Sequence, residues 1–431
     1  MTDDHDQASS EPSGRTAPDG QQPAPVGGPL QGQVQGASAA SAAPARRKRL
    51  VGIDAARGLA LIGLMCIHIL PAFNLQTYGP TLEWTVFAGR SAALFALLAG
   101  VGLAFTSGGR APHTGRALSA DRVALLVRAL LIAGLGLGIN AVMPEPTPAI
   151  GILVYYGVFF LLAIPFLGLS ARALFAASLV LAVAAPVLTH LTRDALPVMV
   201  AENPTAWDLL TAPVATVSQL LLTGTYPALP YLAYVLAGMA MGRLELGRLR
   251  VQLTLLLGGI GLALAAWLVY WVLILHAGGY AQLMIHTPLL GEDGIDEIIL
   301  YGPDPSLPTT TWWWLLVNGP HLNTPVSLLN CLGTGAAVLG FFLLLARVAA
   351  RWLLPLVAIG SMTLTLYSAH LLALAAELHY DRPVLWLVIH LVVAVAFAMA
   401  WRHLRGQGPL ERLVARIAGA ARRRYRSAHP D

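Results

Sequence analysis

Apolar stretches about 20 residues long recur along this chain of 431 residues, and they constrain its fold more than any other feature. A helix needs about 20 apolar residues to cross the hydrocarbon core of a bilayer. Backbone polar groups find no water there, so only helices and closed barrels can cross. Charged residues make up 11% of the chain, against about a quarter in soluble domains. The sequence therefore predicts an all-α protein that crosses the membrane many times.

Ten membrane-spanning helices are predicted, packed as a bundle. Their approximate bounds are 50–72, 86–106, 122–142, 149–169, 171–190, 225–243, 252–276, 326–347, 353–376 and 383–403. Residues 205–223 are more polar and contain a proline, so we expect an interfacial or re-entrant helix there. The long connection at 277–325 carries the triplet Trp312–Trp314. Because tryptophan favours the membrane interface, this connection is predicted to form a lid or a short helix on the outer surface.

Basic residues fix the predicted orientation, because they concentrate in cytoplasmic loops. With the N-terminus inside, the cytoplasmic connections carry Arg110, Arg116, Arg122, Arg172, Arg243, Arg248, Arg250, Arg347 and Arg351. The outer connections carry Glu145, Asp194, Glu202, Asp208, Glu292, Asp293, Asp296 and Glu297. This alternation predicts a multi-pass protein of the cell membrane with both termini in the cytoplasm.

Three regions are expected along the chain. Residues 1–45 are rich in Ser, Ala, Gly, Gln and Pro, a composition that favours a disordered tail. Residues 46–404 form the transmembrane domain, and residues 405–431 form a basic cytoplasmic tail.

Composition also excludes several kinds of site and partner. Cys66 and Cys331 both lie within apolar runs, which indicates neither a disulfide framework nor a cysteine metal site. No metal is predicted. The low charge content speaks against nucleic-acid binding, and the bilayer is the expected surrounding. The oligomeric state is left open.

Ionisable residues inside a membrane span are costly and point to function. The first span contains Asp54, Arg57 and His68. Asp54 and Arg57 are one turn apart and can pair. His68 lies eleven residues beyond Arg57, about 20° from the same meridian and roughly 16 Å further along the axis. Two interpretations remain open: a polar stripe that serves catalysis, or an ion pair and a buried histidine that only stabilise the bundle.

Further polar candidates follow from the topology. Arg90 begins the second span from the outside, where it either snorkels to the interface or faces a polar cavity. Arg128 lies on the cytoplasmic side of the third span, where it can pair with Asp54 or bind phosphate. His321, Asn323 and His370 are predicted near the outer leaflet, as is His68.

Several segments resemble the transmembrane acyltransferase superfamily, in particular heparan-α-glucosaminide N-acetyltransferase-like and YeiB-like bacterial membrane proteins. They are RLVGIDAARGLALIGLMCIHI (49–69), GRSAALFALLAGVGLAF (89–105), TYPALPYLAYVLAGMAMGRL (225–244), HLNTPVSLLNCLGTGAAVLG (321–340), GSMTLTLYSAH (360–370) and GPLERLVARI (408–417). They occur in the order expected for the family and extend over most of residues 49–417.

The resemblance implies a bundle of about ten or eleven helices that transfers an acyl group, usually acetyl. The donor would be cytoplasmic acyl-CoA, and the acceptor an outer-side molecule such as a cell-envelope sugar. Asp54 and Arg57 match the family's D-x-x-R-G opening. The heparan-type enzymes carry a histidine in the loop after the first helix, whereas residues 73–89 here contain none.

Roles are assigned on this basis. The catalytic candidates are His68, His370 and His321; the acyl-CoA-binding candidates are Asp54, Arg57 and Arg128; and the acceptor-binding candidates are Arg90 and Asn323. A transporter or flippase of a small polar or lipid-linked metabolite is the alternative, because polar groups within the membrane would serve it equally well. An inactive membrane scaffold is a third possibility.

Overall fold

The computed structural model describes residues 50–304, 306–378 and 380–428. All of them belong to one compact unit, Arg49–Asp431. The predicted disordered tail, residues 1–45, lies outside the described residues. Helices joined by loops make up this part of the chain, and its only β-type pairing is an isolated bridge between Phe73 and Pro80. The all-α prediction is confirmed.

Seven helical segments in the described residues are long and apolar enough to cross a membrane. They are α1 (Val51–Ile69), α2 with α3 (Leu82–Phe87 and Arg90–Thr106), α4 (Gly115–Asn140), α6 (Ala171–Thr192), α10 (Leu249–Tyr270), α13 (Pro325–Val348) and α16 (Pro383–Arg405). Two bent helix pairs raise the number of candidate spans to nine. The predicted span at 149–169 is a shorter helix, α5 (Leu153–Ala163), followed by a 3-10 turn to Gly168. A multi-pass membrane protein is therefore supported, whereas the count of ten spans and the side of the termini remain predictions.

The predicted span at 353–376 is a broken helix. It consists of α14 (Leu354–Gly360) and α15 (Thr363–Leu374), which meet at an angle of 78°. A Cβ atom on Gly360 would overlap the carbonyl oxygen of Asp54, so α14 packs directly against the backbone of α1. Broken helices within a membrane are tolerated where they are buried in protein or line a cavity.

The second bent pair includes the segment predicted as interfacial or re-entrant. Residues 205–223 form α7 (Ala206–Thr211), α8 (Pro213–Ser218) and a π-helical turn, Gln219–Thr223. The chain then bends by 45° into α9 (Ala228–Gly242).

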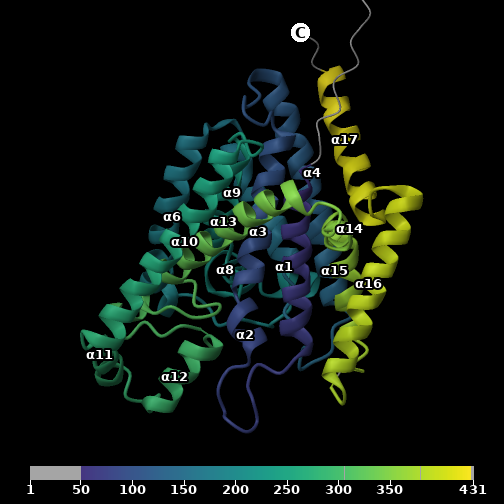
Figure 1. Ribbon diagram of the computed structural model, residues 1–431. Helices are drawn as coiled ribbons and strands as arrows, with labels where there is room; N and C mark the ends of the chain where they lie inside the picture. The colour runs from purple at the N-terminus through teal and green to yellow at the C-terminus, as the bar shows by residue number, and fades with distance from the viewer. Residues whose placement is uncertain (1–49, 305, 379, 429–431) are drawn as a thin grey trace, which may run out of the picture. The chain divides into compact units, whose positions relative to one another are not determined.

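The helices differ in how far they are buried within the protein; α16 lies at the edge of the bundle (Figure 1). In α1, 72% of the apolar span is buried within the protein, against 11% in α16. The outward faces of α6, α10 and α16 carry exposed apolar side chains such as Val180, Leu257 and Val392. Such faces suit contact with lipid.

Small residues permit one of the closest helix contacts. Gly238 and Gly242 of α9 face α3, where a Cβ atom on Gly238 would overlap the backbone of Leu97. Such small residues let helices approach closely. Gly134 and Gly138 of α4, at the same spacing, have open space beside them.

Arginine-rich connections gather at one end of the bundle, which we call the basic end. Arg110 forms an ion pair with Glu245, and Arg347 donates to Gln252 at 2.6 Å. The buried guanidinium of Arg243 donates to carbonyl oxygens at the end of α3, in the α3–α4 connection and at Leu167. The predicted basic tail folds as α17 (Pro409–Ala428), which packs against α4 (Figure 1).

The long connection at the opposite end has a small apolar core of its own. It contains α11 (Gly279–His286), α12 (Gly291–Tyr301) and a 3-10 turn, Trp312–Leu316. The Trp314 side chain is fully buried in this core and donates to the Thr287 hydroxyl at 3.1 Å. The segment is thus a folded cap, held to the loop after α1 by the hydrogen bond from Tyr301 to the carbonyl of Tyr78.

Candidate functional site

A cavity of about 540 Å³ opens between α1, α3, α4, α5, α15 and α17. Ligand pockets usually have volumes of about 300–1,000 Å³. Apolar side chains supply much of its wall, among them Leu64, Phe95, Leu103, Leu125, Ile132 and Phe160. The break between α14 and α15 also lines it, through Gly360, Ser361 and Thr363. The bend that the sequence failed to predict therefore forms part of this cavity.

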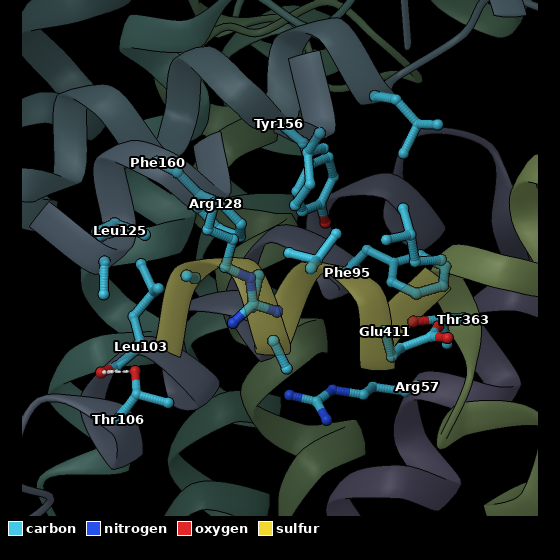
Figure 2. Close-up of a pocket in the computed structure, with 18 of the residues that line it drawn as sticks. Arg57, Phe95, Leu103, Thr106, Leu125, Arg128, Tyr156, Phe160, Thr363 and Glu411 are labelled. Carbon is cyan, nitrogen blue, oxygen red and sulfur yellow. Dashed lines mark hydrogen bonds between the residues drawn. The ribbon is translucent and has the colours of Figure 1, made fainter. Parts of the chain in front are cut away.

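Two arginines from different helices point into the same space (Figure 2). Arg57 of α1 lies 3.4 Å from the Asp54 carboxylate and donates to the carbonyl of Leu98 at 3.2 Å. Arg128 of α4 lies over the Phe160 ring, 5.5 Å from its centroid. The Arg128 Nε atom is buried and has no hydrogen-bond partner in the structure. An anion that entered the cavity would meet both guanidinium groups.

The acidic residues that line the cavity are already engaged. The Glu411 carboxylate accepts from the backbone N–H and the hydroxyl of Thr365, at 3.1 and 2.6 Å. It therefore caps the N-terminus of α15, where a negative charge is favoured. Asp121 lies 2.6 Å from both Arg422 and His113. These pairings leave Arg57 and Arg128 as the cations best placed to meet an anion.

Three histidines whose rings contact one another form a chain, which begins one helical turn beyond residues that line the cavity. His68 lies one turn beyond Leu64 on α1, and His370 lies one turn beyond Tyr367 on α15. His68 Nδ1 is 3.1 Å from His370 Nε2, and His370 Nδ1 is 2.9 Å from His390 Nδ1. Three imidazoles linked in this way can hold or pass on a proton.

The structure separates the other predicted residues from this chain. His321 and Asn323 line a second, smaller cavity, which also borders the segment after α12. Arg90 begins α3 and donates to the carbonyl of Thr85 at 2.5 Å. Of the residues expected to lie near one leaflet, the structure brings His68 and His370 together.

The sequence analysis did not assign four residues of this region to the site. Glu411, Arg422 and Tyr156 line the cavity, and His390 contacts His370. His390 carried a usable signal, because a histidine inside an apolar span is unusual. Glu411 and Arg422 were counted as part of a basic tail, since nothing local shows that α17 returns to the cavity.

No group of three His, Cys, Asp or Glu side chains is placed to hold a metal ion among the residues that the structure describes. The histidine chain is connected by hydrogen bonds between its rings.

One comparison with known proteins identifies a related family. Residues 49–274 match the family model described as heparan-alpha-glucosaminide N-acetyltransferase, catalytic. The match covers more than half of the chain and includes Arg57, His68 and Arg128. His370, His390 and Glu411 lie beyond it. None of the curated proteins matches the chain at a significant level.

Proposed function

Since the chain belongs to the heparan-alpha-glucosaminide N-acetyltransferase catalytic family, we propose that it is a membrane acetyltransferase whose donor, acetyl-CoA, binds in the 540 Å³ cavity. One observation carries this proposal: two arginines point into the cavity, and a hydrogen-bonded histidine pair lies one helical turn beyond residues of its wall. The family's donor is in general acetyl-CoA.

Donor binding follows from the charges. Arg57 and Arg128 bind phosphate oxygens of CoA, because guanidinium groups form strong, often bidentate bonds to phosphate. Arg422 also lines the cavity, where it is paired with Asp121. The basic end, where the donor enters, is the cytoplasmic end in this proposal, and both termini lie on that side.

The apolar wall then accommodates the rest of the donor. Leu64, Phe95 and Ile132 contact the extended arm that carries the thioester. Arg57 and His68 are separated by eleven residues of one helix, or about 16 Å along its axis. A donor held by its phosphates at Arg57 can therefore present its thioester near His68 only in an extended conformation. Tyr156 lines the same cavity, and its buried hydroxyl has no hydrogen-bond partner in the structure.

His68 acts as the base in the transfer. It accepts a proton from the acceptor's amine or hydroxyl as that group attacks the thioester carbonyl. The carbon–sulfur bond breaks, and CoA leaves with the proton that His68 returns to its sulfur. His370 positions the His68 ring through their 3.1 Å contact, and His390 in turn positions His370.

The acceptor lies on the outer side of the cell membrane in this proposal, and a cell-envelope sugar is the class we favour. Family membership does not favour the alternative of a transporter or flippase. A labelling experiment distinguishes the two: purified protein in lipid vesicles receives acetyl-labelled CoA, with glucosamine as the probe acceptor. Label bound covalently to glucosamine supports the enzyme. Movement of unmodified glucosamine across the vesicle membrane, with no covalent label, would favour the transporter.

A further inference from the structure

A second cavity, of about 80 Å³, lies at the opposite end from α17. It is enclosed by the end of α6, the turn before α9 and the loops on either side of the tryptophan triplet. Its polar lining consists of Thr189, His190, Arg193, Thr223, Thr225, Ser306, Thr309, His321 and Asn323. None of the described residues that line it is acidic. Since water occupies about 30 Å³ per molecule in the liquid, the space suits a group of a few heavy atoms.

Three buried polar atoms of this lining have no hydrogen-bond partner in the structure. They are Arg193 Nη1, Thr223 Oγ1 and His321 Nδ1. Buried polar groups are almost always hydrogen-bonded, so three such atoms around one cavity indicate a missing partner. The neighbouring Asp194 carboxylate is not part of the lining: it accepts from the Thr309 hydroxyl at 2.9 and 3.0 Å, and its charge attracts the Arg193 guanidinium.

We propose that this second cavity binds a small oxyanion group, such as the carboxylate or sulfate of an outer-side ligand. The Arg193 guanidinium supplies the charge, and the Thr223 hydroxyl and the His321 ring supply hydrogen bonds. Burial lowers the pKa of His321 to about 4, so its ring is neutral at pH 7.

Contacts between aromatic rings connect this site to the larger cavity. The His321 ring packs edge-on against Tyr226 at 5.5 Å, and Tyr226 packs against Tyr155 at 5.7 Å. Tyr155 directly precedes Tyr156, which lines the larger cavity. A ligand anchored by its anionic group would therefore lie one layer of tyrosines away from that cavity. Anion binding itself does not rest on acetyl transfer.

Binding to the purified, detergent-solubilised protein tests the site. Glucuronate and sulfate serve as anionic probes, and glucose is the neutral control, each titrated by calorimetry at pH 7. We expect one or both anions to bind and glucose not to bind. Arg193→Gln should weaken anion binding about 10-fold to 100-fold, as expected when a charged hydrogen-bond donor is lost.

Two further variants complete the test. Arg382→Gln removes an exposed arginine outside the cavity lining and should leave binding unchanged. Thr223→Val removes one unpartnered hydroxyl at nearly constant volume and should weaken binding several-fold. Thr223→Val still tests anion binding at this cavity if Arg193→Gln does not fold, as judged by size-exclusion chromatography and circular dichroism. Equal binding of glucose and glucuronate, no binding of either anion, or wild-type affinity in the folded cavity variants would overturn the proposal.

Discussion

Arg128→Gln is the most informative single change, because it should affect binding and stability in opposite directions. Arg128 shares its cavity with Arg57, which repels it, and with Glu411, which attracts it, and its Nε atom is buried without a hydrogen-bond partner. Removal of this partly desolvated charge relieves a desolvation cost. Without ligand, Arg128→Gln should therefore be at least as stable as the wild type.

Affinity for acetyl-CoA should fall in the same variant. A hydrogen bond to a charged group contributes about 1.5–3 kcal/mol, and every 1.4 kcal/mol is a factor of ten in Kd. We therefore expect Kd to rise about 10-fold to 150-fold. Calorimetry in detergent gives Kd, and thermal unfolding without ligand gives the midpoint Tm.

Arg172→Gln is the matched control, since Arg172 is an exposed arginine at the start of α6. It should change neither Kd nor Tm. The reasoning is refuted if Arg128→Gln binds acetyl-CoA as tightly as the wild type. It is also refuted if Arg128→Gln without ligand loses several degrees in Tm, because Arg128 would then have a structural role.

Three further predictions concern stability, each measured as thermal unfolding in detergent. Gly360→Ala should cost about 2 kcal/mol or more, because its Cβ atom meets the Asp54 carbonyl; Gly134→Ala, where space is open, should cost nothing. Glu411→Gln should cost about 1 kcal/mol through the weakened cap of α15, and an unchanged Tm would contradict that role. The pKa of His321 is lowered to about 4, below its unfolded value of about 6.5, so its contribution to stability is present above pH 6.5 and is lost as pH falls towards 4. Between pH 7 and pH 5 the loss should be about 2 kcal/mol, and His321→Gln should lose less over that interval.

The sequence was sufficient where a physical rule acts on neighbouring residues. Span length and apolar composition predicted the helices, and the one-turn spacing of Asp54 and Arg57 predicted their ion pair, found at 3.4 Å. The positions of His68 and His370 near the same leaflet followed from counting spans. Their 3.1 Å contact required the tertiary structure.

The rest depends on packing between distant segments. The break after Gly360 lies where α14 packs against the backbone of α1, and an apolar run carries no sign of that contact. Glu411 returns to the cavity only because α17 packs beside α4 and α15. For the same reason, the predicted site residues His321 and Asn323 could not be assigned from the sequence to a second cavity.

Loss of acetyl transfer in His68→Ala, with donor binding intact, is the most direct test of the central claim. Transfer from acetyl-labelled CoA to glucosamine is measured with saturating donor, and Kd for acetyl-CoA is measured on the same preparation. General-base catalysis contributes about 100-fold to 10,000-fold, so the rate should fall at least 100-fold while Kd stays near the wild-type value. His286→Ala, an exposed histidine of α11, is the matched control and should retain full activity. A wild-type rate in His68→Ala would contradict the claim that His68 is the base in the transfer.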